Sequence, residues 1–276
     1  MKSFTSPASY QRSWTIFIVG AAQAAMLVSG PLLAADRMSD HDVKQLIDQI
    51  RSSEDRFNDA LDDSVKHGRL RGPNGDVDVH EFLEDFEENL DRVKDRFKPD
   101  YSASNEVKVA LLQANAIDTF FRSRPAGTKG ESEWHRLVDN LEVLAAAYHA
   151  SFPLAADAPV RRVNDKEIEA AAEAVAKNGD HFKSALDDAL KKDPSMDAAS
   201  RKQVIEQAEA LVDDAKTLRS RVSDGKPSSG EAGRVVQQAE QLQQWLAGRT
   251  LGPPVTSNWS ALGPYLQTIS TAYGLK

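Results

Sequence analysis

The stretch Asp55–Asp63, DRFNDALDD, decides how this sequence is interpreted, because it recurs as Asp180–Asp188, DHFKSALDD. The phenylalanines of the two stretches, Phe57 and Phe182, are 125 positions apart (182 − 57 = 125). Self-similarity at a fixed offset is the mark of an internal repeat and is sought before any motif. The chain is therefore predicted to contain one structural unit twice, and we call residues 125 positions apart counterparts.

The same offset holds toward the far end of both units, without a gap. Trp134 and Tyr148 have Trp259 and Tyr273 as counterparts, and the loop residue Arg124 has Arg249. Between these anchors the apolar positions agree in character: Val79, Leu83, Phe86, Leu90, Val93 and Phe97 correspond to Val204, Ala208, Leu211, Ala215, Leu218 and Val222. Helical periodicity alone would not also align tryptophan, tyrosine and loop residues, so we favour a duplication over a chance match of two alanine-rich stretches.

Each unit is predicted to be four helices. The first buries a face whose apolar residues are spaced by three, four and seven, as a 3.6-residue period requires: Val43, Leu46, Ile47, Ile50, Phe57 and Leu61. Its start is marked by Ser39 with Asp42, and in the second unit by Asn164 with Glu167, a capping box in both. Short connections favour antiparallel neighbours, so the predicted fold class is all-α, with two tandem up-and-down four-helix bundles.

The second helix is expected to begin near Asp78 in the first unit and at Ser200, with Gln203, in the second. Gly263–Pro264 should interrupt the last helix of the second unit. The predicted domains are residues 1–35 as a signal peptide, 36–152 as the first unit, 153–162 as a linker containing Pro153 and Pro159, and 163–276 as the second unit.

The first 35 residues have the layout of an export signal. Lys2 and Arg12 precede an uncharged segment, 13–35, whose apolar part spans Trp14–Val28. Small residues just before Asp36 suit cleavage there, although leucine occupies the position three before either candidate cut. An uncleaved membrane anchor is the alternative, because about 20 uncharged residues can span a bilayer. The predicted localisation is periplasmic or secreted.

Composition excludes several classes of function. The chain has 34 basic and 42 acidic residues, a net charge of −8, with no basic cluster, which disfavours binding to nucleic acid or, once the signal is removed, to membranes. Without cysteine there are no disulfides, thiolate metal sites or haem attachment sequences. The partners expected are therefore an envelope protein or a small ligand.

Three polar patterns could carry chemistry. Gly75–Phe82 resembles the second half of a calcium-binding loop, but Leu70 and Gly72 stand where the first oxygen ligands belong, so a glycine turn with a helix cap at Asp78 is favoured. None of the histidines has the spacing of a di-iron or zinc motif, and solvent-facing roles are expected. Those histidines are His41, His67, His80, His135, His149 and His181.

The third pattern is a row of carboxylates on one predicted helix, which we interpret as its solvated face rather than an acid–base pair. The row is Glu81, Glu84, Asp85, Glu87, Glu88, Asp91 and Asp95.

Polar counterparts shared by the two units are interpreted as ion pairs and caps, with a shared binding role as the alternative. They are Asp62/Asp187, Asp63/Asp188, Lys66/Lys191, Arg96/Arg221 and Arg124/Arg249. The aromatic counterparts at 134/259 and 148/273 are expected in the helical cores, although they could line a ligand cavity.

The sequence thus predicts no catalytic, cofactor-binding or metal-binding residue and no cofactor. The leading hypothesis is a non-enzymatic binding or scaffolding protein of a bacterial cell envelope. The alternative is a periplasmic small-molecule or metal-ion carrier with a pocket inside a bundle, and an enzyme assembled only in three dimensions is a weaker third.

Overall fold

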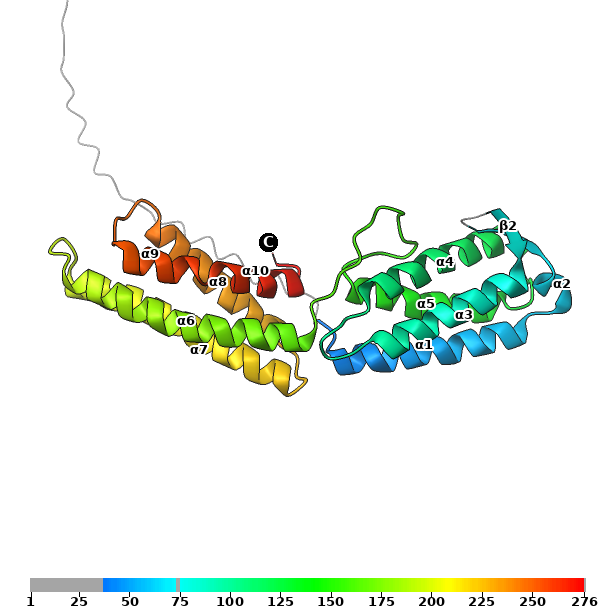
Figure 1. Ribbon diagram of the computed structural model, residues 1–276, viewed down its shortest axis with the longest axis horizontal. Coiled ribbons are helices and arrows are strands. Elements are labelled where there is room, and N and C mark those ends of the chain that lie inside the picture. Colours follow the sequence, from blue (N-terminus) through cyan, green and yellow to red (C-terminus); the bar gives the residue numbers. More distant parts are fainter. Residues whose placement is uncertain (1–36, 73–74, 276) are drawn as a thin grey trace, which may run out of the picture. The chain divides into compact units, whose positions relative to one another are not determined.

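The computed structural model describes residues 37–72 and 75–275, which are mostly helical (Figure 1). This agrees with the predicted all-α class except for one small two-stranded sheet. The predicted export signal lies outside the described residues. Within the described ranges, no helix combines the length and the apolar character needed to cross a membrane.

The first helix group comprises α1 (Asp40–Ala60), the short α2 (Asp63–Lys66), α3 (Val79–Arg96), α4 (Ser104–Arg122) and α5 (Glu131–Ala147). α1 packs against α3 and α5, and α4 packs against the same two helices. Phe57 of α1 lies with its ring centroid 5.2 Å from that of Trp134 on α5 and 5.5 Å from that of Phe121 on α4. The apolar stripe expected in the first helix therefore does form part of a buried core.

A β-hairpin stands where the sequence predicted only a glycine turn. Strands β1 (Arg69–Gly72) and β2 (Gly75–Asp78) pair antiparallel, with Leu70 opposite Val77 (Figure 1). Gly75 has φ 125°, a backbone conformation that side-chain-bearing residues rarely adopt. Leu70 is only 4% exposed and anchors the hairpin in the first core. The predicted cap is confirmed: the Asp78 carboxylate accepts from the backbone N–H of His80 at the start of α3.

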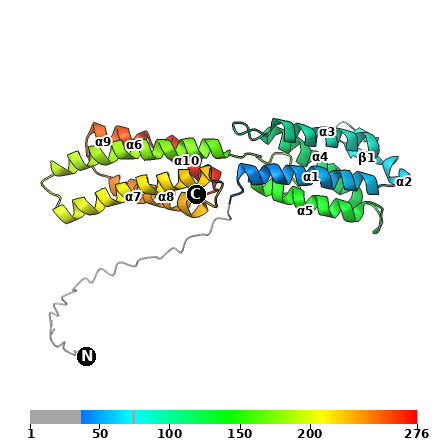
Figure 2. The ribbon, with the colours of Figure 1, turned by 90° about the horizontal axis from the view of Figure 1, so that it is seen from below.

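The second helix group comprises α6 (Asp165–Lys191), α7 (Ala198–Ser223), α8 (Ser229–Leu246), α9 (Pro253–Ser260) and α10 (Gly263–Ala272). α6 packs against α7, α9 and α10, and α8 packs against α7 and α10 (Figure 2). A core of its own lies between these helices. The interruption predicted at Gly263–Pro264 is confirmed, because α9 and α10 are separate helices there.

Helix starts test the predicted caps directly. Both capping boxes are present, at Ser39 for α1 and at Asn164 for α6. The predicted start of α7 at Ser200 is wrong by one turn. Asp197 caps this helix instead, since its carboxylate accepts from the backbone N–H groups of Ala199 and Ser200. A carboxylate at this position also interacts favourably with the helix dipole.

Candidate functional site

The polar residues singled out from the sequence do not gather into one site. All six histidines are exposed, in agreement with the solvent-facing roles expected for them. The carboxylates of the predicted acidic row lie on α3, and most of them are exposed as expected. Two of them, Glu87 and Asp91, instead take part in an ion cluster described below.

Two of the five duplicated polar pairs form matching contacts in both groups, whereas Asp62 caps α2 and its counterpart Asp187 pairs with Lys191. Arg96 pairs with Glu106 at 2.9 Å, and their counterparts Arg221 and Glu231 pair at 3.3 Å. The guanidinium of Arg124 lies 4.5 Å from the ring centroid of Phe120. The counterparts of this pair, Arg249 and Trp245, are 4.4 Å apart. These contacts join neighbouring helices or brace helix ends, which favours the structural interpretation of the set.

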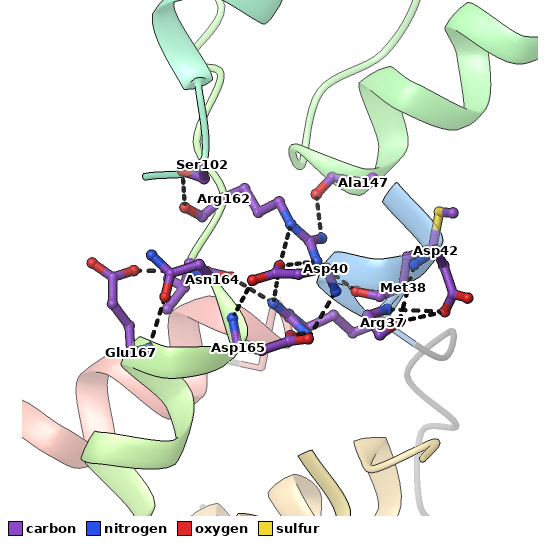
Figure 3. A network of polar contacts seen from close by, with 12 residues as sticks. Arg37, Met38, Asp40, Asp42, Ser102, Ala147, Arg162, Asn164, Asp165 and Glu167 are labelled. Carbon is purple, nitrogen blue, oxygen red and sulfur yellow. Dashed lines mark hydrogen bonds and ion pairs between the residues drawn. The ribbon is translucent and has the colours of Figure 1, made fainter. Parts of the chain in front are cut away.

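Two aspartates at the starts of α1 and α6 cap each other's helix. The backbone N–H of Asp40 donates to the carboxylate of Asp165 at 2.8 Å, and the N–H of Asp165 donates to Asp40 at 2.9 Å (Figure 3). The two residues are 125 positions apart. Each carboxylate therefore meets a free N–H group at the N-terminus of its counterpart's helix, where negative charge is stabilised.

Two arginines complete this arginine–aspartate network, which we define as Arg37, Asp40, Arg162 and Asp165. Each arginine binds the aspartate of its counterpart segment and one backbone carbonyl beside it (Figure 3). The contacts are Arg37 to Asp165 at 2.5 Å and to the carbonyl of Val163 at 2.6 Å, and Arg162 to Asp40 at 2.8 Å and to the carbonyl of Met38 at 2.6 Å. The contacts are thus reciprocal under the 125-residue offset.

The network is shielded from water. The side chain of Arg162 is 2% exposed, and that of Arg37 is 8% exposed. Burial lowers the pKa of Arg162, as does the nearby positive charge of Arg37, whereas Asp40 raises it. Buried charges of this kind are tolerated only when they are paired and hydrogen-bonded. Each charged side chain of the network is paired with another member of it, so we assign the network a structural role.

A second charged cluster lies between α1 and α3, and we call Arg51, Glu54, Glu87 and Asp91 the Glu54 cluster. Arg51 donates to Glu54 at 2.8 Å, to Glu87 at 3.2 Å and to Asp91 at 2.7 Å. Glu54 itself is fully buried. Its Oε1 atom has no hydrogen-bond partner within the described residues, and the same is true of Oδ1 of Asn58, one turn later.

Burial dominates the chemistry of Glu54. The pKa of this carboxyl is raised to about 7, and burial is the main cause. The charge of Arg51 acts to lower the pKa, and the charge of Glu87 acts to raise it. Glu54, Asp55 and Glu87 also place one carboxylate oxygen each within 4.8 Å of one another. The cluster can therefore exchange a proton near neutral pH, and it has the oxygen donors that hard cations prefer, although Arg51 already balances part of its charge.

The sequence contains one signal for Glu54 beyond the patterns given above. The apolar face of α1 runs through Ile50 and Phe57 with a gap of seven, and the helical position between them is residue 54. The second group differs here, because the counterparts of Glu54 and Glu87 are Gly179 and Val212. A Cβ atom at residue 179 would lie 2.7 Å from Cγ2 of Val212, so these two helices approach closely without polar groups.

The Trp259 groove is an apolar surface cleft of the second group, between α8 and the α9–α10 pair. Its floor consists of Val236, Ala239, Trp259 and Leu266, and its rim consists of Glu240, Gln243, Gly263, Gln267 and Ser270. Trp259, Leu266 and Val236 are each partly exposed. Trp134, the counterpart of Trp259, is fully buried. Of the four aromatic residues expected in the cores, Trp134, Tyr148 and Tyr273 are therefore buried as predicted, and only Trp259 is partly open to solvent.

The indole N–H groups of the two tryptophans donate to residues that are counterparts of each other. The indole N–H of Trp134 donates to Asp118 at 3.2 Å, and that of Trp259 donates to Gln243, the counterpart of Asp118. This side-chain pairing fixes the orientation of the ring that lines the groove. The described residues thus define a mostly helical protein with an ion cluster around a buried glutamate in one part and an apolar groove in the other. No protein-family model, curated protein or solved structure matches this chain.

Proposed function

We propose that this chain is an exported, non-enzymatic binding or scaffolding protein of a bacterial cell envelope, built from two copies of one up-and-down four-helix bundle. The Trp259 groove is the observation that carries the binding role. Large apolar side chains on a protein surface cost free energy unless a partner covers them, and such patches are typical of interaction sites. Tryptophan is also the residue type most enriched at the energetic centres of interfaces.

Several contacts support the duplication within this proposal. The capping boxes of α1 and α6, the Arg96–Glu106 and Arg221–Glu231 pairs and the reciprocal arginine–aspartate network all recur at an offset of 125 residues. A periodic match of unrelated helices would not reproduce ion pairs and caps at a constant offset. The export part of the proposal rests on the layout of residues 1–35 alone.

Site-specific photo-cross-linking in cells tests the proposal. A photoreactive amino acid at Gln267, on the rim of the groove, should yield a discrete adduct in the periplasmic fraction, with a mature chain that starts at Asp36. The same amino acid at Lys202, an exposed position on α7, serves as the control. The adduct should vanish in a Leu266→Asp variant. Adducts that are equal at both positions, or a protein that stays in the cytoplasm, would contradict the proposal.

A metal-ion carrier is the second candidate, and the Glu54 cluster is the observation that favours it. Three carboxylate oxygens within 4.8 Å could bind a cation if Arg51 moved away. Native mass spectrometry after incubation with Ca²⁺, Mn²⁺ or Zn²⁺ distinguishes the two functions. One bound ion that is lost in a Glu54→Gln variant would favour the carrier, and equal adventitious binding by both proteins would favour the scaffold.

A further inference from the structure

We propose that the Trp259 groove binds an apolar, non-helical segment of a partner polypeptide, which inserts one leucine-sized side chain between α8 and α10. The proposal deepens the binding role proposed above and rests on the proposed duplication. It adds the class of ligand and the way in which the ligand binds. We infer both from a segment of this same chain, Phe152–Val160, which packs on the first helix group.

In the first group, the corresponding place is filled by that segment. Leu154 is 4% exposed and belongs to the first core, with Phe152 and Val160 packed against the same core. The side-chain amide of Asn115 on α4 donates to the carbonyl of Leu154 at 2.6 Å and accepts from its N–H at 2.9 Å. This pair of bonds holds the backbone of the segment against α4 much as a neighbouring strand would.

A second contact fixes the direction of the segment along α4. The ammonium group of Lys108, two helical turns before Asn115, donates to the carbonyl of Ala158 at 3.1 Å. The segment therefore runs antiparallel to α4. It contains no helix or strand between Leu154 and Val160.

Residue by residue, the floor of the groove corresponds to positions that are buried in the first group. Leu111, Ala114, Trp134 and Leu141 of the first group are all fully buried. Their counterparts are the four floor residues of the groove, of which only Ala239 is classed as buried. Asn115, the residue that holds Leu154, has Glu240 on the groove rim as its counterpart.

The rim indicates how a partner would be held. A carboxylate accepts hydrogen bonds and cannot donate them, so Glu240 can reproduce only one of the two bonds made by Asn115, the one from a backbone N–H. The partner segment therefore needs an unpaired backbone N–H at its inserted residue, which excludes proline at that position. Bonds to a charged acceptor are stronger than neutral ones, which compensates in part for the missing donor.

A synthetic peptide with the sequence of Ala150–Val160, ASFPLAADAPV, serves as the probe for this groove. Titrated into the intact ¹⁵N-labelled chain, it should shift the indole N–H resonance of Trp259 while leaving that of buried Trp134 in place. The same peptide with aspartate at its leucine should bind at least tenfold more weakly. Equal binding of both peptides, or no shift of the Trp259 resonance at millimolar peptide, would overturn the proposal.

Two protein variants serve as controls. Leu266→Asp should abolish the peptide-induced shift, whereas Tyr265→Asp, at an exposed residue beside the groove, should leave it unchanged. An unchanged indole resonance of Trp245, at the end of α8, shows in both variants that the second group is still folded. If Leu266→Asp binds the peptide as the unchanged chain does, the proposal is wrong.

Other occupants of the groove would give different results. A concentration-dependent dimer that Leu266→Asp abolishes would identify a second copy of the chain, and peptide binding only after removal of residues 1–35 would identify that segment. Either result would overturn the proposal of a separate partner. A groove-dependent cross-link at Gln267 without peptide binding would refute this inference and leave the proposed binding role standing.

Discussion

Glu54 is the residue at which the energetics of burial and charge conflict most clearly. It occupies a position on the apolar face of α1, where a neutral side chain would be expected, and Arg51 is its one ion-pair partner among the described residues. Because burial is the largest influence on its pKa, the neutral form is favoured in the folded protein. The folded chain therefore holds a proton that the unfolded chain releases at the ordinary pKa of a glutamate.

This conflict predicts a pH dependence of stability. The contribution of neutral Glu54 is complete below its ordinary pKa of 4.5 and is lost as the pH rises through about 7, its value in the folded protein. A Glu54→Gln variant should consequently be more stable than the unchanged chain at pH 8, by about 1–3 kcal/mol, and nearly equal to it at pH 4.5. Urea unfolding at both pH values measures the difference, and the exposed Glu84→Gln is the control. A variant that is less stable at pH 8 would contradict the assignment.

The two arginines of the arginine–aspartate network differ in burial, which allows a graded test. Arg162→Met would leave the carboxylate of Asp40 and the carbonyl of Met38 without their buried donor, a loss of about 3–5 kcal/mol in the free energy of unfolding. Arg37→Met should cost less, because the side chain of Arg37 is more exposed. Chemical denaturation of both variants provides the comparison. Surface substitutions usually change the free energy of unfolding by less than about 0.5 kcal/mol. If both variants stay within that range of the unchanged chain, the network does not have a structural role.

At the scale of the elements, helices were predictable and the exceptions have physical causes. Apolar periodicity identified the buried face of α1, and side-chain caps identified its start at Ser39 and that of α6 at Asn164. The β-hairpin was missed because strands of four residues are too short to show an alternating pattern. The start of α7 was misplaced because Asp197 and Ser200 are both good caps, and the choice depends on the preceding loop.

The candidate sites were less predictable than the helices, because they depend on residues from separate elements. The Glu54 cluster joins α1 to α3, and no local pattern states that Arg51 lies within reach of Asp91. The Trp259 groove follows from a difference in burial between counterpart residues, because Leu111, Trp134 and Leu141 are fully buried and their counterparts are partly exposed. The gap of seven in the α1 stripe was the one usable signal for a buried polar side chain.

Two helical glycines have different surroundings, so their substitution by alanine is expected to have opposite effects on stability. Gly179→Ala would place a methyl group 2.7 Å from Cγ2 of Val212, and such overpacking typically costs about 1–3 kcal/mol. Gly233→Ala, within α8, meets nothing within 4 Å and should stabilise the protein by about 0.5–1 kcal/mol through helix propensity. Thermal unfolding of both variants measures the contrast. A double variant with Val212→Ala should recover most of the loss at residue 179.

At the scale of the whole molecule, the chain has two hydrophobic cores that share no buried residue. Each of them contains the phenylalanine of the repeated stretch, Phe57 in one and Phe182 in the other. Groups with separate cores can open with separate free energies, as native-state hydrogen exchange shows in many proteins. The chain is therefore expected to behave as two cooperative units linked through the arginine–aspartate network.

Hydrogen exchange after a core truncation tests this expectation. Phe57→Ala removes a fully buried ring and should lower the protection of α1, α3, α4 and α5 by about 3–5 kcal/mol. Amides of α6, α7 and α8 should keep their exchange rates, apart from those near Asp165. Equal loss of protection in both helix groups would show that the chain unfolds as one unit.

The glycine at 179 also bears on how a gene with the proposed duplication could change. Recombination between similar halves tends to make them alike, and a transfer of the segment around Glu54 into the later half would bring a carboxylate against Val212 in place of a hydrogen atom. The resulting protein would have both a steric clash and an unpaired buried charge. Under the proposed duplication, a sequence exchange at this point would therefore be expected to destabilise the second helix group.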